Sequence, residues 1–273
     1  MSRVLLFSMR NITRHVARCA GYEFEDVVAQ CDAVDIVAPV EAVEPNRLAR
    51  YARSLVSDTP RIQGVTAVDR TYDLFFAFCH SSRDLRYLEL LQGCREKCRR
   101  AVCVLSELWP SSIPAMSRNR ETLRDFDYIF SNIESSVEAI RGLTGRPCEF
   151  MPLGVDALRF CPFPASPPRH IDVCNIGRRY KGLHRVLLDR ADAGELLYIY
   201  DTVGDFSVLD VVEHRRLLAN LVKRSRFFVM FPPKFDRPEE TAGLFEIGSR
   251  VFEGTAGGAV VVGAPPRCGT FEQ

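Results

Sequence analysis

The sequence has almost no net charge, few lysines and no long apolar run. Its 36 basic and 35 acidic residues leave a formal charge of +1 over 273 residues. No overall field therefore attracts the chain to nucleic acid or to an anionic membrane. No apolar run approaches the roughly 18 residues that cross a bilayer, and the short apolar stretch at the amino terminus has no cleavage site after it. We expect a cytoplasmic protein with no transmembrane segment and no nucleic-acid partner.

Paired metal ligands and disulfide signals are also missing. Of the ten cysteines, most lie in apolar, strand-like runs, where a thiol behaves as a small buried hydrophobe. Cys94 and Cys98 are spaced by one helical turn, but no second Cys or His pair at zinc spacing accompanies them. With no export signal, a disulfide scaffold is not expected either. The sequence predicts reduced structural thiols and no metal site.

The composition is that of a globular chain, with 47% hydrophobic and 26% charged residues. It excludes disordered, collagenous and coiled-coil classes, and the length fits two α/β domains better than one. In residues 1–152, short apolar runs alternate with amphipathic stretches, which predicts a parallel sheet covered by helices. The expected strands are 4–7, 33–38, 74–78, 101–105, 128–130 and 149–151, and the expected helices are 12–30, 45–56, 85–97 and 135–143.

A proline-rich stretch at 153–169 interrupts the alternation and is typical of a stiff linker. The pattern resumes in a second domain at 170–273, and ligands in such sheets bind beyond the carboxyl ends of the strands, in a cleft between the domains. No helix is expected after the last strand, so the second domain reads as incomplete and the chain as truncated. The expected strands are 171–176, 196–200, 227–230 and 259–262, and the expected helices are 183–188, 214–225 and 247–256.

The first candidate site is the string Gly-Arg-Arg-Tyr-Lys-Gly at 177–182, directly after a predicted strand. A glycine turn that leads into a helix presents outward-pointing N–H groups to an anion. Arg178, Arg179 and Lys181 add three cations suited to phosphate. The string matches neither a Walker loop nor the dinucleotide glycine pattern, and the alternative is a solvated basic loop.

The second candidate is the helix at 247–256. Glu246, Arg250, Glu253 and Gly257 share one face of it, at helical spacing. They form either an ordinary surface stripe of ion pairs, or a site where a carboxylate grips ribose hydroxyls and Arg250 holds it or meets phosphate. In the second case, the glycines after the helix allow a close backbone approach.

Several segments together resemble the donor-binding domain of GT-B-fold glycosyltransferases, in the family 4-like and spore-maturation-protein-like branch. The resemblance covers most of residues 100–273 and weakens toward the amino terminus. It implies two Rossmann-like domains with a cleft between them. The segments that carry it are SELW (106–109), FDYIFSN (126–132), MPLGVDALRF (151–160), IDVCNIGRRYKGLH (171–184), YIYDT (198–202), EHRRLLANLVKRSRFFV (213–229) and PEETAGLFEIGSRVFEGTAGGAVVVGAPP (238–266).

The resemblance also implies roles for single residues. Glu253 matches the glutamate that binds the nucleotide ribose. Arg178 or Arg179, with Lys181, matches the cations that hold the diphosphate and stabilise the leaving group, without a metal or cofactor. Family 4 enzymes pair two glutamates eight positions apart, whereas Glu246 and Glu253 are seven apart, which leaves the role of Glu246 open.

Two candidate catalytic residues follow strands of the first domain. His80 comes after 74–78, and related retaining enzymes have a cleft histidine in a comparable place. Glu107 comes after 101–105 and is a competing cleft carboxylate. Each is expected to face the cleft because it lies at the carboxyl end of a parallel strand. No glycine-rich loop follows the first strand, so the acceptor cannot be read from this domain.

The sequence therefore predicts an enzyme that transfers a sugar from a nucleotide-diphosphate donor to an unknown acceptor, with retained configuration. A nucleotide-sugar epimerase of the same fold is an alternative, because it shares the donor site. A third is a non-catalytic, truncated product that only binds nucleotide sugars.

Overall fold

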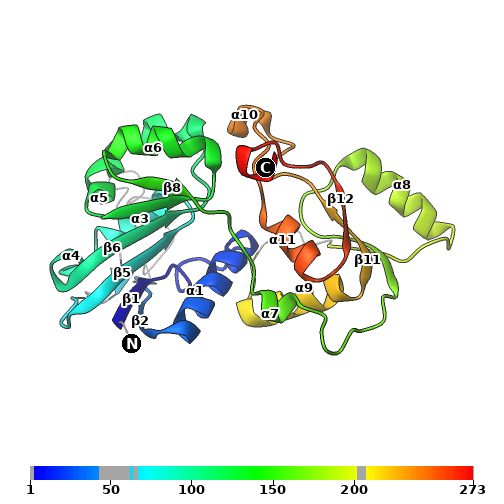
Figure 1. Cartoon of the computed structure of the whole chain (residues 1–273), viewed down its shortest axis with the longest axis horizontal. Coiled ribbons are helices and arrows are strands. Elements are labelled where there is room, and N and C mark those ends of the chain that lie inside the picture. The colour runs from blue at the N-terminus through cyan, green and yellow to red at the C-terminus, as the bar shows by residue number, and fades with distance from the viewer. Residues whose placement is uncertain (1–2, 43–61, 64–66, 202–206, 273) are drawn as a thin grey trace.

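The computed structural model describes residues 3–42, 62–63, 67–201 and 207–272, and it contains two parallel β-sheets with helices packed around them (Figure 1). The first sheet has six strands in the order β2-β1-β5-β6-β7-β8, and every neighbouring pair is parallel. The strands are β1 (Arg3–Phe7), β2 (Ala33–Val37), β5 (Tyr72–Cys79), β6 (Cys98–Leu105), β7 (Tyr128–Ser131) and β8 (Cys148–Phe150).

Helices join these strands. The α-helices of this part are α1 (Cys19–Cys31), α3 (Ser82–Leu88), α4 (Cys94–Lys97), α5 (Arg120–Arg124) and α6 (Val137–Thr144). The 3-10 helices are η1 (Val16–Arg18), η2 (Pro110–Asn119) and η3 (Glu134–Ser136). A short antiparallel pair, β3 (Val40–Glu41) with β4 (Ile62–Gln63), lies apart from the large sheet. We call the described residues from 3 to 150 the first half.

The second sheet has four parallel strands in the order β10-β9-β11-β12. We call residues 171–272 the second half; the connection from β8 to β9 contains only α7 (Ala157–Phe160). The strands are β9 (Ile171–Asn175), β10 (Tyr198–Tyr200), β11 (Ser225–Met230) and β12 (Val260–Gly263). The helices are α8 (Lys181–Asp192), α9 (Val211–Lys223), α10 (Pro238–Thr241), α11 (Ser249–Ala256) and α12 (Gly269–Glu272).

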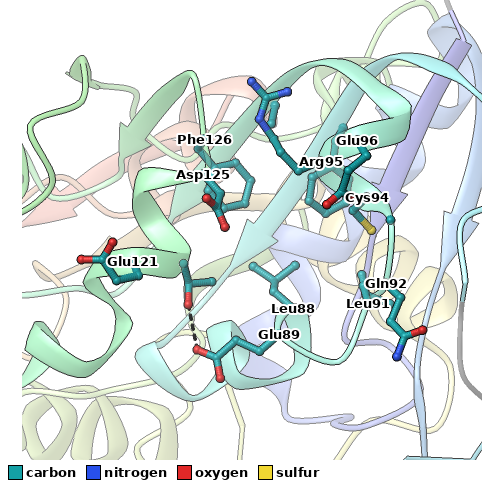
Figure 2. A pocket seen from close by; sticks show the side chains of 14 residues that line it. Leu88, Glu89, Leu91, Gln92, Cys94, Arg95, Glu96, Glu121, Asp125 and Phe126 are labelled. Atoms are coloured by element: carbon teal, nitrogen blue, oxygen red, sulfur yellow. Dashed lines mark hydrogen bonds between the residues drawn. The ribbon is translucent and has the colours of Figure 1, made fainter.

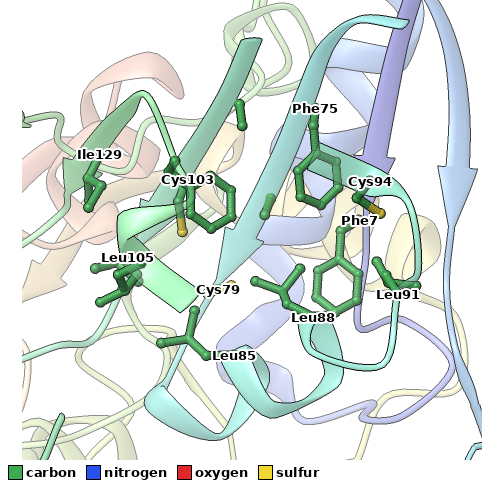
Figure 3. Close-up of a cluster of buried hydrophobic side chains, with 14 of the residues drawn as sticks. Phe7, Phe75, Cys79, Leu85, Leu88, Leu91, Cys94, Cys103, Leu105 and Ile129 are labelled. Carbon is green, nitrogen blue, oxygen red and sulfur yellow. The ribbon is translucent and has the colours of Figure 1, made fainter. Parts of the chain in front are cut away.

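The larger core lies on one face of the first sheet (Figure 3). Its central strands β5 and β6 are rich in apolar residues because helices cover both faces of a parallel sheet. Buried cysteines fill part of this core, and all ten cysteines are free thiols, as expected. Residues drawn in Figure 3 include Phe7, Phe75, Cys79, Leu85, Leu88, Leu91, Cys94, Cys103, Leu105 and Ile129.

The predicted alternation of strands and helices is confirmed, although several short elements were not predicted and some helix bounds differ. The expected helix 85–97 is broken: α3 ends at Leu88, and Gly93, at φ +78°, starts the separate helix α4. Cys98 consequently begins β6 instead of lying one turn after Cys94 on a helix. A short helix, α12, follows β12 where none was expected. The expected helix at 45–56 lies outside the described residues.

The domain boundaries predicted at 152 and 170 stay predictions. Among the described residues, none of the helices combines the length and the apolar character that a membrane crossing needs.

Candidate functional site

The basic loop after β9 lies at the carboxyl end of that strand, as predicted. Gly177 adopts φ +93°, a left-handed conformation that favours glycine, and its N–H donates to both carboxylate oxygens of Asp201 at 3.1 Å. The guanidinium of Arg179 also donates to Asp201, both to its carboxylate and to its carbonyl oxygen. Arg178 pairs with Asp236 at 2.9 Å. Two of the three predicted cations are thus already paired.

Lys181 is the third cation of this loop and the first residue of α8. Its side chain is exposed, and within the described part of the chain it has no hydrogen bond or ion pair. The N–H groups of the first turn of a helix are left without helical acceptors. Lys181 and the start of α8 therefore offer an available cation and N–H donors at the same place, which suits an anion.

Arg250 reaches this loop from α11. A Cβ atom added to Gly177 would lie 3.4 Å from Nη2 of Arg250, so the guanidinium packs directly against the loop. Arg250 also binds the carboxylate of Glu253. The sequence placed Arg250 on a candidate ligand face, and the structure brings it to the basic loop.

Glu253 is completely buried, and guanidinium groups engage both its oxygens. Arg215 donates to Oε1 at 2.6 Å, and Arg250 binds Oε2. Burial alone would raise the pKa of Glu253, but Arg250 and Arg215 outweigh it and lower the pKa. The carboxylate is therefore ionised and holds Arg250 in place. The ribose contact that the resemblance implies stays a prediction, and in this arrangement it requires Arg250 to move.

Within the described part of the chain, Glu246 and Gly257 are both packed against other parts of the protein and do not face an open ligand site. Glu246 is 2% exposed, and its two oxygens accept the backbone N–H groups of Glu134 and Ser135 at 3.0 Å each, which caps η3 of the first half. A Cβ atom on Gly257 would lie 2.5 Å from Val222, so this glycine allows α11 to pack closely on α9. Neither residue faces the basic loop through a contact, and their predicted donor roles stay untested.

One group of side chains could offer ligand atoms to a metal ion. Atoms of Glu134, Glu246 and Cys268 lie within 4.8 Å of one another. The carboxylates are, however, engaged by backbone N–H groups, since Glu134 also accepts from Thr270 at 3.2 Å. The arrangement is explained as a contact that joins the end of the described chain to η3.

His80 and Glu107 are brought together at the carboxyl ends of β5 and β6. His80 Nε2 lies 3.7 Å from Oε1 of Glu107, and the N–H of Glu107 donates to the carbonyl of His80 at 3.0 Å. Burial lowers the pKa of His80, and the positive charge of Arg18 acts in the same direction, whereas Glu107 opposes it. A neutral imidazole beside a carboxylate can accept or pass on a proton.

Lys234, which the sequence did not single out as a site residue, joins this pair from the second half. Its Nζ lies 3.4 Å from Oε2 of Glu107 and 3.0 Å from Oε2 of Glu240. The segments after β6 and β11 therefore meet at Glu107 and Lys234. The available signal was a rare lysine shortly after the strand at 227–230, a position that ordinarily reaches a ligand site in an α/β fold.

A second contact between the halves is a buried ionic network between α1, α9 and α11, which the sequence analysis did not predict. Arg215 of α9 binds Glu23 of α1 at 2.7 Å and Glu253 at 2.6 Å, and all three side chains are at most 2% exposed. Arg159 makes a second ion pair with Glu23 at 3.0 Å. The signal was an arginine on the apolar face of α9, in line with Leu218 and Val222.

An open cavity of about 560 Å³ lies at the other end of the first sheet (Figure 2). Phe75, Leu88 and Phe126 form part of its apolar lining, and Glu121 and Asp125 stand at its rim. Phe75 lies toward the amino end of β5, away from His80. None of the predicted site residues lines this cavity.

Comparison with solved structures finds glycosyltransferases and an epimerase at low identity. One alpha-glucosyltransferase, in complex with UDP and a 13-mer DNA containing an HMU base, is 12% identical, with a TM-score of 0.45. The alignment covers 95% of this chain and 79% of that one. An alpha-glucosyltransferase with UDP-glucose and DNA containing an abasic site gives 12% identity, a TM-score of 0.49 and the same coverage.

The third structure is UDP-GlcNAc 2-epimerase from Neisseria meningitidis bound to UDP-GlcNAc. It is 9% identical, with a TM-score of 0.41, and the alignment covers 94% of this chain and 90% of that one. No protein-family model matches the sequence, and no curated protein matches it. At these identities the comparison concerns the arrangement of helices and strands alone.

These structures correct one expectation. The balanced charge of the chain predicts no nucleic-acid partner, yet two of the similar structures named above hold DNA. The exclusion is wrong, because net charge describes the average field of a chain and not the local surface that meets a ligand.

Proposed function

We propose that this chain is a GT-B-type glycosyltransferase that moves a sugar from a nucleotide-diphosphate donor to an acceptor. In this proposal, residues 1–152 form the acceptor domain, 153–169 the linker and 170–273 the donor domain. The transfer retains configuration and needs no metal or other cofactor. The family resemblance of the sequence supports the proposal, and so do the two parallel sheets, whose following segments meet at Glu107 and Lys234.

The observation that carries the proposal is the arrangement around Gly177. The loop lies at the carboxyl end of β9, with Lys181 at the start of α8 and Arg250 packed against the glycine. Departure of a nucleoside diphosphate builds negative charge on the leaving group. Fixed cations and N–H groups aimed at that charge lower the barrier, so Lys181 and Arg250 are the residues we assign to the diphosphate.

Binding of UDP, GDP, ADP and dTDP tests the donor site directly. A ligand at a hundred times its Kd stabilises the folded state by about 2.7 kcal/mol, which thermal unfolding detects easily. We expect one diphosphate to stabilise the chain clearly more than the others. If none does, the assignment of a nucleotide donor site is wrong.

The variant Lys181→Ala is expected to weaken binding of that diphosphate about tenfold, or about 1.4 kcal/mol, since it removes a charged donor. Lys97→Ala is the matched control, because Lys97 is an exposed lysine of α4 in the first half. Isothermal titration gives both Kd values. Equal Kd values for the two variants would contradict a role of Lys181 in the donor site.

Product analysis separates the three functions considered. Steady release of the nucleoside diphosphate from its sugar conjugate indicates an enzyme and excludes a pure binding protein. Release that accelerates with an acceptor indicates transfer, whereas conversion of the nucleotide sugar without an acceptor indicates epimerisation. Acceptors for this test include DNA duplexes, since two similar structures contain DNA.

A further inference from the structure

We propose that Lys234 is a positioning residue for the Glu107–His80 pair, supplied to the first half by the second. The pair becomes a three-member group only when the segments after β6 and β11 are in contact. The catalytic meaning of this group rests on the proposed function, but its geometry does not.

Lys234 has ionic partners in both halves of the molecule. Its ammonium lies between Glu107 at 3.4 Å and Glu240 at 3.0 Å, and its side chain is only 19% exposed. The ammonium also lies 6.0 Å from the ring centroid of the buried Trp109, within the range of a cation–π contact. A lysine on a solvated surface has no such set of partners. Here the carboxylates and the indole restrict where the ammonium can lie.

The backbone at Lys234 supports the same conclusion. Its φ of +53° is left-handed, a conformation that costs free energy in a residue with a Cβ atom. The N–H of Arg237 donates to the carbonyl of Lys234 at 2.8 Å and closes the turn. The strained turn aims the lysine at the first half, and a glycine, which would relieve the strain, could not supply the ammonium.

The segment 231–237 that carries Lys234 is also tied to the basic loop. Asp236 binds Arg178 of that loop at 2.9 Å. Phe231 contacts Tyr180 with ring centroids 6.0 Å apart and stacks on Phe235 at 4.7 Å. A ligand that reorders the basic loop therefore acts on the segment that positions Lys234, and through it on Glu107 and His80.

The charged groups around His80 give the expected effect of removing Lys234. His80 faces the carboxylates of Glu107 and Asp84, the guanidinium of Arg18 and the imidazole of His15. Lys234 binds Glu107 on the side away from His80. Without the ammonium, Glu107 acts on His80 uncompensated, and a protonated imidazole is stabilised.

The deciding experiment is an NMR titration of the His80 ring in the full chain, assigned with His80→Gln. We expect Lys234→Met to raise the pKa of His80 by roughly half a unit, while Lys234→Arg leaves it near the wild-type value. Lys97→Met, which removes an exposed lysine of the first half, is the matched control. A His80 pKa that is the same in Lys234→Met and Lys97→Met overturns the proposal.

Thermal unfolding of each variant checks that the fold is intact, and Lys234→Gln, which also removes the charge, takes the place of Lys234→Met if that variant unfolds. Release of UDP from UDP-glucose is the activity probe. We expect Lys234→Met to lower kcat roughly 10- to 100-fold with KM nearly unchanged, because the pair is misplaced while the donor still binds. No turnover in the wild type would count against the proposed function, whereas the titration alone decides the role of Lys234.

Discussion

Glu25 shows how strongly burial changes a single residue. The side chain is 1% exposed in α1, where it accepts the Ser8 hydroxyl at 2.5 Å and pairs with Arg10 at 2.9 Å. Its other oxygen, Oε1, has no hydrogen-bond partner in the described part of the chain. Burial raises the pKa of Glu25 to about 7 in spite of the bonds to Ser8 and Arg10. Between pH 4.5 and about 7, Glu25 is therefore protonated in the folded protein and ionised in the unfolded chain.

This proton makes stability depend on pH. The folded pKa lies above the ordinary value of 4.5, so the stabilisation is complete below about 4.5 and is lost as pH rises through about 7. We expect the free energy of unfolding of the wild type, relative to Glu25→Gln, to fall by on the order of 3 kcal/mol over that window. Urea unfolding at several pH values measures it. The control is Glu121→Gln, which removes an exposed carboxylate; a Glu25→Gln profile parallel to the wild type would contradict the assignment.

At the residue scale, the sequence placed some candidate residues better than others. The positions of the basic loop, His80 and Glu107 at strand ends were predictable because strand ends can be read from apolar runs, and their roles stay predictions. The partners of Glu246 and Glu253 could not be read, because they come from segments more than a hundred positions away or from another helix. Lys234 could not be predicted, because its contact with Glu107 forms only when the two halves of the fold come together.

Among the elements, the strands were predicted to within a few residues and the helices less well. The apolar run of a buried parallel strand is continuous and ends abruptly, so its ends can be read from the sequence. The apolar spacing of a helix can continue past the residue at which the helix ends, so helix ends are harder to read. The expected helix 85–97 illustrates this, since Gly93 interrupts it by adopting a left-handed φ that the spacing does not reveal. Short helices such as α5 and α7, with five and four residues, were missed because they have too few turns to show a period.

The packing of α11 on its sheet gives a prediction at this scale. A Cβ atom on Gly254 would lie 2.5 Å from Val261 of β12 and 2.9 Å from Phe228 of β11. Gly254→Ala is therefore expected to destabilise the protein by about 1–3 kcal/mol through overpacking. Thermal or urea unfolding measures the change.

Gly142 is the matched control within a helix. It lies in α6 with nothing within 4 Å of an added Cβ atom, so Gly142→Ala should stabilise by about 0.5–1 kcal/mol through helix propensity. If the two substitutions had the same effect, the close approach of α11 to the second sheet would be refuted.

On the scale of the whole molecule, Arg215 joins the two halves. It binds Glu23 of the first half and Glu253 of the second in a buried network. Removing one partner of a buried ion pair leaves an uncompensated charge in a medium of low dielectric constant. Removing a single member of the network should therefore destabilise the fold strongly. This holds even if apolar side chains in place of all three members would stabilise the fold equally well.

We expect Arg215→Met to lower the free energy of unfolding by about 3–5 kcal/mol. Arg216→Met is the control on the same helix, because Arg216 is 62% exposed and, among the described residues, pairs only with Glu213 one turn away. That variant should change stability by less than about 0.5 kcal/mol. Urea unfolding of both measures the difference, and similar values would show that the network does not support the contact between the halves.

Two ion pairs between the halves, Glu107–Lys234 and Glu23–Arg215, differ in their access to water, and dissolved salt should therefore act on them unequally. Glu107 and Lys234 are 33% and 19% exposed, whereas Glu23 and Arg215 are nearly inaccessible. Ions in solution screen exposed pairs far more than buried ones. We therefore expect a higher ionic strength to weaken the Lys234–Glu107 pair and to leave the Arg215–Glu23 pair intact. The influence of Lys234 on Glu107 would then depend on salt more than the stability of the fold does.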